Sequence, residues 1–385
     1  MQKQLRHKRL SMILLLSMIL TGVTGCVKQT MSGQTGDMTQ SSISQSHTSQ
    51  SSKKEDTGSL KKYSISLTDL FDTVTQIIGF ASSQEEFDGY VQKIRQTMTE
   101  YHQLYDIYHD YDGIHNMKTI NDHAGKEAVT VDDRIIALLD RAIEIGQLTN
   151  GKMNVAYGAV LSVWHEYREQ GMAKPAKAQL PPVELLREKS KHVDLTGVVI
   201  DHEKKTVYLP DAEMRLDVGA IAKGYATEMT AQMIEQAGMR HGMFSVGGNI
   251  RVIGTKLNDA GGEVAWNVGI QNPNQETADP VLKLLKLSGK QSLVTSGNYE
   301  RYYTVNGKNY HHIIDPETLY PSIRYTSVSI VCEDSGLADA LSTALFNMDI
   351  DAGKKLLGHW TGVEACWLLP DGSVELSDGF TKWEK

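Results

Sequence analysis

Cysteine, long apolar runs and basic charge are all scarce in this chain. Its 385 residues include three cysteines, Cys26, Cys332 and Cys366, and no CxxC pair. This scarcity argues against a zinc site and against a scaffold held by disulfides. The longest nearly uninterrupted apolar run is residues 10–23, a stretch of 14 residues. An ordinary transmembrane helix needs about 20, so this run is too short to be one.

The balance of charge is acidic. The net charge is −8, and residues 1–25 contribute four positive charges and no acid. Without that segment the net charge falls to −12. Sequence-independent binding of nucleic acid needs a basic stripe, so this chain is a poor candidate for it.

The N-terminus has the pattern of a secretory signal peptide. A basic region at 3–9 precedes the apolar run at 10–23. Small residues then lead to a lone cysteine in the order Val23-Thr24-Gly25-Cys26, which is similar to a bacterial lipoprotein signal. We expect cleavage before Cys26 and lipidation of its sulfur. The alternative is an uncleaved anchor with an incidental cysteine.

The next segment, residues 27–60, is rich in Ser, Thr, Gln, Lys and Gly and contains no aromatic residue. Such a composition cannot bury enough apolar surface to become ordered, and a coil of this length reaches about 30 Å. We therefore predict a signal peptide over 1–25, a lipidated tether over 26–60 and a folded domain over 61–385. The tether would hold the domain at the extracytoplasmic face of the cell membrane.

The folded part mixes strands and helices without a regular βαβ repeat, which predicts an α+β domain. Apolar residues at helical spacing and alternating apolar residues indicate the two kinds of element. Helices are expected over 85–108, 132–148 and 336–346, partly over 153–167, and from the turn before Tyr225 to Gly238. Strands are expected over 63–68, 71–79, 214–216, 243–254, 264–270, 281–288 and 325–332, and around Val198 and Val207. A further strand is expected to start at residue 292 and to open into the glycine turn at Gly297. Hairpins are expected to turn at Asn306-Gly307 and Asp371-Gly372.

Polar chemistry and tight backbone meet in residues 214–226. Asp217 follows the short strand, and Gly219 and Gly224 stand on either side of Lys223. The free N–H groups and positive dipole of a helix start attract an anion. Lys223 is not followed by Ser or Thr, so the segment is not a Walker P-loop. The alternative is a plain strand-to-helix turn with an exposed lysine.

Asp339 and Thr343 lie four residues apart in the Ala/Leu-rich helix and therefore share a face. A carboxylate and a hydroxyl offer only oxygen to a ligand, which suits Mg²⁺ and not Zn²⁺. The alternative is an exposed aspartate and a threonine that bonds back to its own helix.

Three further polar turns are candidates for ligand contact. His311 and His312 precede an Asp-Pro turn, and histidine is the natural proton acceptor near neutral pH. Ser296-Gly297 ends a strand, and Gly248 lies at a Gly-Gly break where the backbone can approach a ligand. Each of these features alone is also common at purely structural positions.

Four runs of the folded part stand in one order. They are LDVGAIAKGYA at 216–226, SVGGNI at 245–250, TSGNYER at 295–301 with HIIDP at 312–316, and ADALSTA at 338–344. Together they resemble the ApbE family of FAD:protein FMN transferases, over residues 65–385. The resemblance implies an α+β domain of the ApbE type. It also implies a Mg²⁺-dependent enzyme that cleaves FAD, joins FMN by a phosphoester bond to a Thr or Ser of an acceptor protein, and releases AMP.

The resemblance further implies roles for single residues. His312 matches the histidine proposed to deprotonate the acceptor hydroxyl, with His311 as the alternative because the doubled histidine leaves the register open by one. The metal-binding positions match the carbonyl of Ala220 and the side chains of Asp339 and Thr343. The FAD-binding positions match Asp217 and Lys223, together with the ring-contacting Phe71 and Tyr111. Gly248, Ser296 and Gly297 are further candidates for contact with FAD because they lie in polar glycine turns.

The chain departs from the family pattern at two places. The usual Gly-x-Phe-Asp reads Gly151-Lys152-Met153-Asn154, and an asparagine cannot carry the charge of the aspartate. The usual Thr-Gly after Asp-Pro reads Thr318-Leu319, so a different turn is expected there.

Other functions remain open. With water as acceptor, the same site would hydrolyse FAD to FMN and AMP, and the changed charge at Asn154 keeps this reading open. A lipoprotein that stores or carries flavin would need neither His312 nor the pair of Asp339 and Thr343. Their joint presence therefore argues against a carrier. A solute-binding lipoprotein would show two similar α/β lobes, which the element order lacks.

Overall fold

The computed structural model describes residues 60–274 and 279–384. The predicted signal peptide, Cys26 and the tether up to residue 59 lie outside these residues. Within them, no helix is both long enough and apolar enough to cross a membrane.

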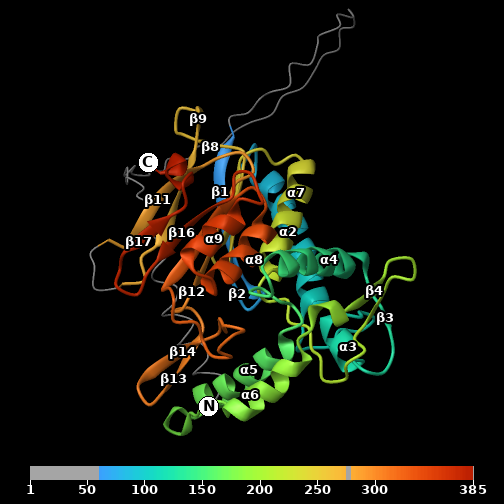
Figure 1. Cartoon of the computed structure of the whole chain (residues 1–385). Helices are drawn as coiled ribbons and strands as arrows, with labels where there is room; N and C mark the ends of the chain where they lie inside the picture. The colour runs from blue at the N-terminus through green and yellow to red at the C-terminus, as the bar shows by residue number, and fades with distance from the viewer. Residues whose placement is uncertain (1–59, 275–278, 385) are drawn as a thin grey trace, which may run out of the picture. The chain divides into compact units, whose positions relative to one another are not determined.

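A sheet of eight strands forms the centre of the described residues, and every neighbouring pair in it is antiparallel (Figure 1). Successive side chains point to opposite faces. On the strand Ser327–Cys332, for example, Val328 and Ile330 pack against the helices and Val331 packs on the other side. The strand order is β1 (Lys61–Leu70), β2 (Thr73–Ala81), β6 (Gly242–Val246), β7 (Asn249–Ile253), β12 (Ser292–Gly297), β15 (Ser327–Cys332), β16 (Glu364–Leu368) and β17 (Val374–Leu376).

One face of the sheet is covered by three helices, α2 (Gln84–Tyr105), α7 (Ala222–Gln236) and α8 (Ser335–Phe346). The second of these packs between the other two, and α8 lies directly on β12 and β15. Asp334 caps α8 by accepting hydrogen bonds from two backbone N–H groups of its first turn. The largest apolar core lies between these helices and the sheet.

The opposite face of the sheet is covered by the hairpin of β10 (Trp266–Gln271) and β11 (Val281–Leu287). Their inward apolar side chains, together with Phe380 and Trp383, form a second core. The sheet is therefore buried on both faces over these strands.

A third, smaller core lies beside the hairpin of β13 (Tyr302–Val305) and β14 (Lys308–His311). Helix α5 (Gly158–Ala173) packs on β13 and on α6 (Val183–Lys189) (Figure 1). The remaining elements are α3 (Met117–Asp122), β3 (Val129–Thr130), α4 (Asp133–Leu148), β4 (Val199–Asp201), β5 (Thr206–Tyr208), β8 (Lys256–Leu257), β9 (Glu263–Val264), α9 (Ile350–Leu357), and the 3-10 turns Pro175–Lys177, Ser190–His192, Leu195–Gly197 and Phe380–Trp383.

The α+β class predicted from the sequence is confirmed. The two predicted hairpin turns are confirmed as well: Asn306 and Gly307 both have positive φ, and Gly372 turns the chain between β16 and β17. Gly238 follows the end of α7 with φ +114°, as expected for a glycine that ends a helix.

Several predicted boundaries are wrong. Phe71 is not in a strand but in the turn between β1 and β2, with φ 51°. The helix expected to reach residue 108 ends at Tyr105. Residues 214–216 make no strand, only a single bridge between Arg215 and Tyr157. The pattern of apolar residues cannot distinguish this extended segment from a strand, because its partners lie far away in the sequence.

Candidate active site

The extended segment at 214–218 leads the chain into the site. The side chain of Asn121 bonds to the backbone of this segment as a neighbouring strand would. Nδ2 of Asn121 donates to the Leu216 carbonyl at 2.9 Å, and its Oδ1 accepts from the Leu216 N–H at 2.7 Å. The Asp217 N–H donates to the Val155 carbonyl at 2.8 Å. These bonds satisfy the backbone and fix the place of Asp217.

The first turn of α7 is capped by a side chain from another helix. Gly224 is the third residue of α7, so its N–H is one of the donors at a helix start that have no partner within the helix. It donates to Oδ2 of Asp339 on α8 at 2.8 Å. Only glycine fits at 224, since a Cβ would lie 2.2 Å from the Ser335 carbonyl oxygen and 2.5 Å from the Asp339 Cβ.

Asp339 is buried between α7 and α8, with 4% of its surface exposed. Burial raises the pKa of its carboxyl, and the Lys223 ammonium, 3.9 Å from Oδ2, opposes this increase. A buried carboxylate needs compensating positive charge nearby. The Asp339 site therefore has the electrostatics of a cation site.

Oxygen atoms of three residues could hold such a cation. They are the Asp339 carboxylate, the Thr343 hydroxyl one turn further along α8 and the carbonyl of Ala220, which lies just before α7. In the described part of the chain no group of three or more His, Cys, Asp or Glu side chains could hold a metal ion. A set made only of oxygen donors fits Mg²⁺.

Asp217 lies on the other side of the same turn, where its Oδ1 accepts from the Gly219 N–H at 2.9 Å. Burial raises the pKa of its carboxyl, and three basic side chains nearby oppose the increase, those of His165, Arg301 and Lys223. Two of these, Lys223 and Arg301, act on Asp339 in the same way. The two carboxylates therefore share one group of cations.

The adjacent histidines have different surroundings. Both ring nitrogens of buried His311 are engaged: Nε2 donates to the Ser322 carbonyl at 2.7 Å, and Nδ1 accepts from the Ile313 N–H at 3.2 Å. His312 donates from Nδ1 to the Arg301 carbonyl at 3.3 Å. That bond sets the tautomer and leaves Nε2 of His312 as the proton acceptor. The geometry therefore favours His312 over His311 as a base.

Burial lowers the pKa of His312 to about 3, and Arg301 is the next cause. His311, Lys223 and Arg168 lower it further. The His312 ring is consequently neutral at physiological pH. Positive charge from three other segments of the chain surrounds it.

Ser296 and Gly297 support the site from β12. The Ser296 Oγ lies 2.8 Å from the Ser342 Oγ, which in turn donates to the Asp339 carbonyl at 2.8 Å. A Cβ at Gly297 would lie 2.7 Å from the ring of Tyr299. Ser296 thus holds the Ser342 side chain in place, and the absence of a side chain at Gly297 leaves room for the Tyr299 ring.

The turn between β6 and β7 is open on one side. Gly248 has φ +91°, and no atom lies within 4 Å of where its Cβ would be. The next residue, Asn249, is 2% exposed, and its Nδ2 makes no hydrogen bond of regular geometry among the described residues. The amide nevertheless lies close enough to the Asp339 carboxylate to lower the pKa of that group by hydrogen bonding.

Phe71 and Tyr111 belong to one aromatic cluster around His102. The rings of Phe71 and His102 meet edge-on at 5.4 Å, and those of Tyr111 and His102 at 6.4 Å. The Tyr111 hydroxyl donates to Oδ2 of Asp106 at 2.7 Å. The structure therefore brings the two predicted ring-contacting residues together.

Tyr108 connects this cluster to the charged site. Its ring stacks on that of His165 at 4.9 Å, and Nδ1 of His165 lies 2.7 Å from the Arg168 guanidinium. Tyr108 is 50% exposed, so its burial is partial; this partial burial raises the pKa of its hydroxyl, and Asp217 is the next cause. The sequence pattern did not point to these three residues or to the roles of Arg301 and Asn249. Arg301 and Asn249 lie within the four runs that resemble the family, and this was the one signal that could have found them.

Both departures from the family pattern have a structural account. Asn154 donates from Nδ2 to the Val193 carbonyl at 2.9 Å, and its Oδ1 accepts from the Ala156 N–H at 2.8 Å. An aspartate could not make the first bond. Leu319 has φ 62°, the left-handed conformation that favours glycine, and its carbonyl accepts from Nε1 of Trp164 at 2.9 Å.

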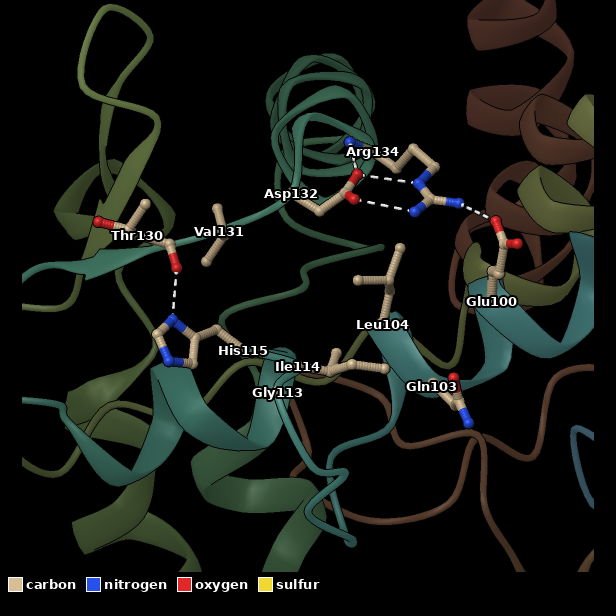
Figure 2. A pocket seen from close by; sticks show the side chains of 10 residues that line it. All are labelled: Glu100, Gln103, Leu104, Gly113, Ile114, His115, Thr130, Val131, Asp132 and Arg134. Carbon is tan, nitrogen blue, oxygen red and sulfur yellow. Dashed lines mark hydrogen bonds and ion pairs between the residues drawn. The ribbon is translucent and has the colours of Figure 1, made fainter.

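Figure 2 shows a separate hollow of about 300 Å³, between the end of α2, the loop at 113–115 and residues 130–134. Arg134 in this hollow makes two bonds of 2.8 Å to Asp132 and one of 2.6 Å to Glu100. Its charge is therefore already neutralised. None of the candidate site residues lines this hollow.

Comparison with known proteins gives consistent results. The model of the ApbE family matches residues 64–367. An FAD:protein FMN transferase of Treponema pallidum is 34% identical over 273 residues, which is 68% of this chain and 73% of that protein. One from Klebsiella pneumoniae is 29% identical over 259 residues, which is 67% of this chain and 76% of that protein.

Solved structures agree. The crystal structure of the ApbE protein from Thermotoga maritima matches with a TM-score of 0.72 and 29% identity, over 84% of this chain and 100% of that one. The flavin transferase ApbE from Vibrio cholerae matches with a TM-score of 0.69 and 22% identity, over 84% and 99%. The second likeness bears on the fold alone.

Proposed function

The chain belongs to the ApbE family, and from this premise we propose that its site transfers the FMN part of FAD to a hydroxyl of an acceptor protein and releases AMP. The observation that carries the proposal is the buried Asp339 carboxylate at the start of α7. It accepts a hydrogen bond from the Gly224 N–H at 2.8 Å and lies 3.9 Å from the Lys223 ammonium. This arrangement suits a metal-bound diphosphate, which is the part of FAD that must be cleaved.

Asp339, Thr343 and the Ala220 carbonyl would hold Mg²⁺ through oxygen. When bound, the ion would neutralise charge on the diphosphate. The Lys223 ammonium would bind further phosphate oxygens. The Asn249 amide lies beside the Asp339 carboxylate and would help to hold it in place.

His312 would accept the proton of the acceptor hydroxyl at Nε2. The hydroxyl oxygen then bonds to the phosphorus on the FMN side of the diphosphate. The bond from that phosphorus to the bridging oxygen breaks, and AMP leaves with the bridging oxygen and its electron pair. One phosphoester bond forms and one phosphoanhydride bond breaks, so no further reactant is needed.

The low pKa of His312 links the base to FAD. A ring with a pKa of about 3 is a weak base, and three of the groups that lower it are cations, those of Arg301, Lys223 and Arg168. A bound diphosphate would offset these charges, because an anion near a histidine raises its pKa. The basicity of His312 should therefore rise when FAD occupies the site.

One experiment distinguishes this function from its alternatives. The full chain in detergent is incubated with FAD, Mg²⁺ and a candidate acceptor protein, and the products are analysed by mass spectrometry. A transferase yields AMP together with an acceptor that carries FMN. Free FMN and AMP with an unmodified acceptor would indicate the hydrolase, and intact FAD would indicate a carrier. Because the amide of Asn154 is engaged with backbone groups, its lack of charge is weak support for the hydrolase.

We also propose that Cys26 is lipidated and anchors the domain at the extracytoplasmic membrane face. The proposal rests on the order of basic, apolar and small residues before this cysteine. Cys26→Ser should release the protein from the membrane fraction or leave the precursor unprocessed. Normal processing and membrane retention of that variant would refute the anchor.

A further inference from the structure

Ile323 is unusually exposed for a large apolar side chain. It is 82% exposed, and no other large apolar side chain of the described residues exceeds 50%. A single exposed apolar residue on a surface is ordinary. What distinguishes Ile323 is the rigidity of its neighbours and its position next to the histidine pair.

The backbone on both sides of Ile323 is firmly held. Ser322 is buried, donates from Oγ to the Phe346 carbonyl at 3.0 Å and donates from its N–H to the Ile313 carbonyl at 3.0 Å. On the other side, Arg324 forms an ion pair with Asp349. The exposed side chain is therefore presented by an ordered segment, and little backbone entropy would be lost if a partner covered it.

The Ile323 segment lies next to His312. The Ser322 carbonyl accepts the hydrogen bond from Nε2 of His311, the residue directly before His312. A second exposed apolar side chain lies near the histidine pair: Tyr302 is 42% exposed, and it pairs with His311 across the β13–β14 hairpin. Exposed apolar side chains thus occupy two segments next to the histidine pair.

FAD has its own set of contacts in the proposed function. The carboxylates and the lysine that would hold the metal and the diphosphate come from residues 217–224 and from α8. Neither Tyr302 nor Ile323 belongs to these segments. The second substrate is a protein whose hydroxyl must reach Nε2 of His312, so the chain on either side of that hydroxyl has to pass over the neighbouring surface.

We propose that Tyr302 and Ile323 are the docking surface for the acceptor protein and hold the segment that flanks its Thr or Ser. The inference rests on the proposed function, because it is that function which supplies a protein as second substrate. Rigid apolar and aromatic side chains of this kind commonly carry much of the binding energy at protein interfaces.

The test compares Ile323→Asp and Tyr302→Ala with the control Val199→Asp. Val199 is a 49% exposed apolar residue on β4, outside the proposed surface. The probe is the polypeptide that gains flavin fluorescence when the wild-type full chain, FAD and Mg²⁺ are incubated with a membrane extract, purified afterwards in its unmodified form. Its KM and kcat are measured for each variant, together with the Kd for FAD.

We expect Ile323→Asp to raise the KM for this acceptor about tenfold or more, as at a strong interface contact. The Kd for FAD should stay unchanged, and Val199→Asp should behave as wild type. An unchanged KM in both Ile323→Asp and Tyr302→Ala overturns the inference. It is equally overturned if these variants change only self-association or binding to phospholipid vesicles. If wild type labels no polypeptide and leaves FAD intact or hydrolysed, the proposed function itself has failed and the docking surface falls with it.

Discussion

The two halves of the candidate site are built on different cores. The Asp339 half lies where α7 and α8 pack tightly together over the large core of the central sheet. The His312 half follows the β13–β14 hairpin, whose apolar side chains belong to the smaller core beside α5. Ile313 packs in the large core and Ile314 in the smaller one, so His312 lies at the boundary between them.

The two halves of the site are therefore held in place by different kinds of contact. The half that would bind the metal and FAD is fixed by close contacts of backbone and helix, where a single added methyl group would clash. The half that would activate the acceptor depends on side-chain tautomer and local charge. Substitutions in the two halves should therefore have separable effects, on ligand binding in one case and on transfer in the other.

The largest effect is expected for Asp339→Ala. Loss of the only carboxylate of the oxygen set should reduce FAD cleavage at least about a thousandfold, since a metal's charge stabilisation is worth several kcal/mol. Isothermal titration of the variant with Mg²⁺ should show no binding. Asp334→Ala on the same helix is the control, because it should cost only the stability of a helix cap, about 0.5–2 kcal/mol. Full turnover of wild type in excess chelator would contradict the metal role.

His312→Ala should show most clearly that FAD binding and flavin transfer depend on different halves of the site. We expect the Kd for FAD to stay nearly unchanged and transfer to fall by about 10²–10⁴-fold, the usual contribution of a general base. His311→Ala should instead lower thermal stability, because both nitrogens of that ring hold backbone groups. If FAD affinity collapses in His312→Ala while turnover per bound FAD stays normal, His312 is a binding residue.

Gly224→Ala tests the close contact of α7 and α8. The added Cβ would force the helices apart and should cost about 1–3 kcal/mol, measured by thermal or urea unfolding. Mg²⁺ affinity should fall as well, since Asp339 would lose the Gly224 N–H. Gly89→Ala in α2 is the matched control: its Cβ would meet nothing within 4 Å, so the change should be neutral or slightly stabilising. Equal stability of both variants would refute the contact.

The smallest change is expected in the pH profile. A histidine with an ordinary pKa of about 6.5 would lose its base form as the pH falls below that value. Since the pKa of His312 in the free protein is lowered to about 3, its neutral form persists well below that point. The kcat/KM for the acceptor at FAD concentrations far below saturation should therefore show no acid limb near pH 6.5, down to about pH 5. An acid limb near pH 6–7 would show that the ring has an ordinary pKa.

Much of this site was visible in the sequence, and the rest depended on distant contacts. The spacing of Asp339 and Thr343 placed both on one helix face, and the family resemblance pointed to Ala220. What brings Asp339 to the start of α7 is a tertiary contact, because Gly224 donates to a residue 115 positions away. In the same way, the sequence left His311 and His312 as alternatives, and only the hydrogen bonds to Ser322 and Arg301 distinguish them.

The sequence by itself determined the elements whose signals are local. Turn residues set the two hairpins, helical spacing and glycine ended α7, and mixed periodicity indicated the α+β class. Tertiary structure alone decided which polar groups meet. Asn121 pairs with the Leu216 backbone as a strand would, Arg301 and Arg168 lie near His312, and the Asn249 amide lies beside Asp339. The physical reason is that periodicity reports which way neighbouring side chains face, whereas hydrogen bonds and charges act between whichever groups the folded chain brings together.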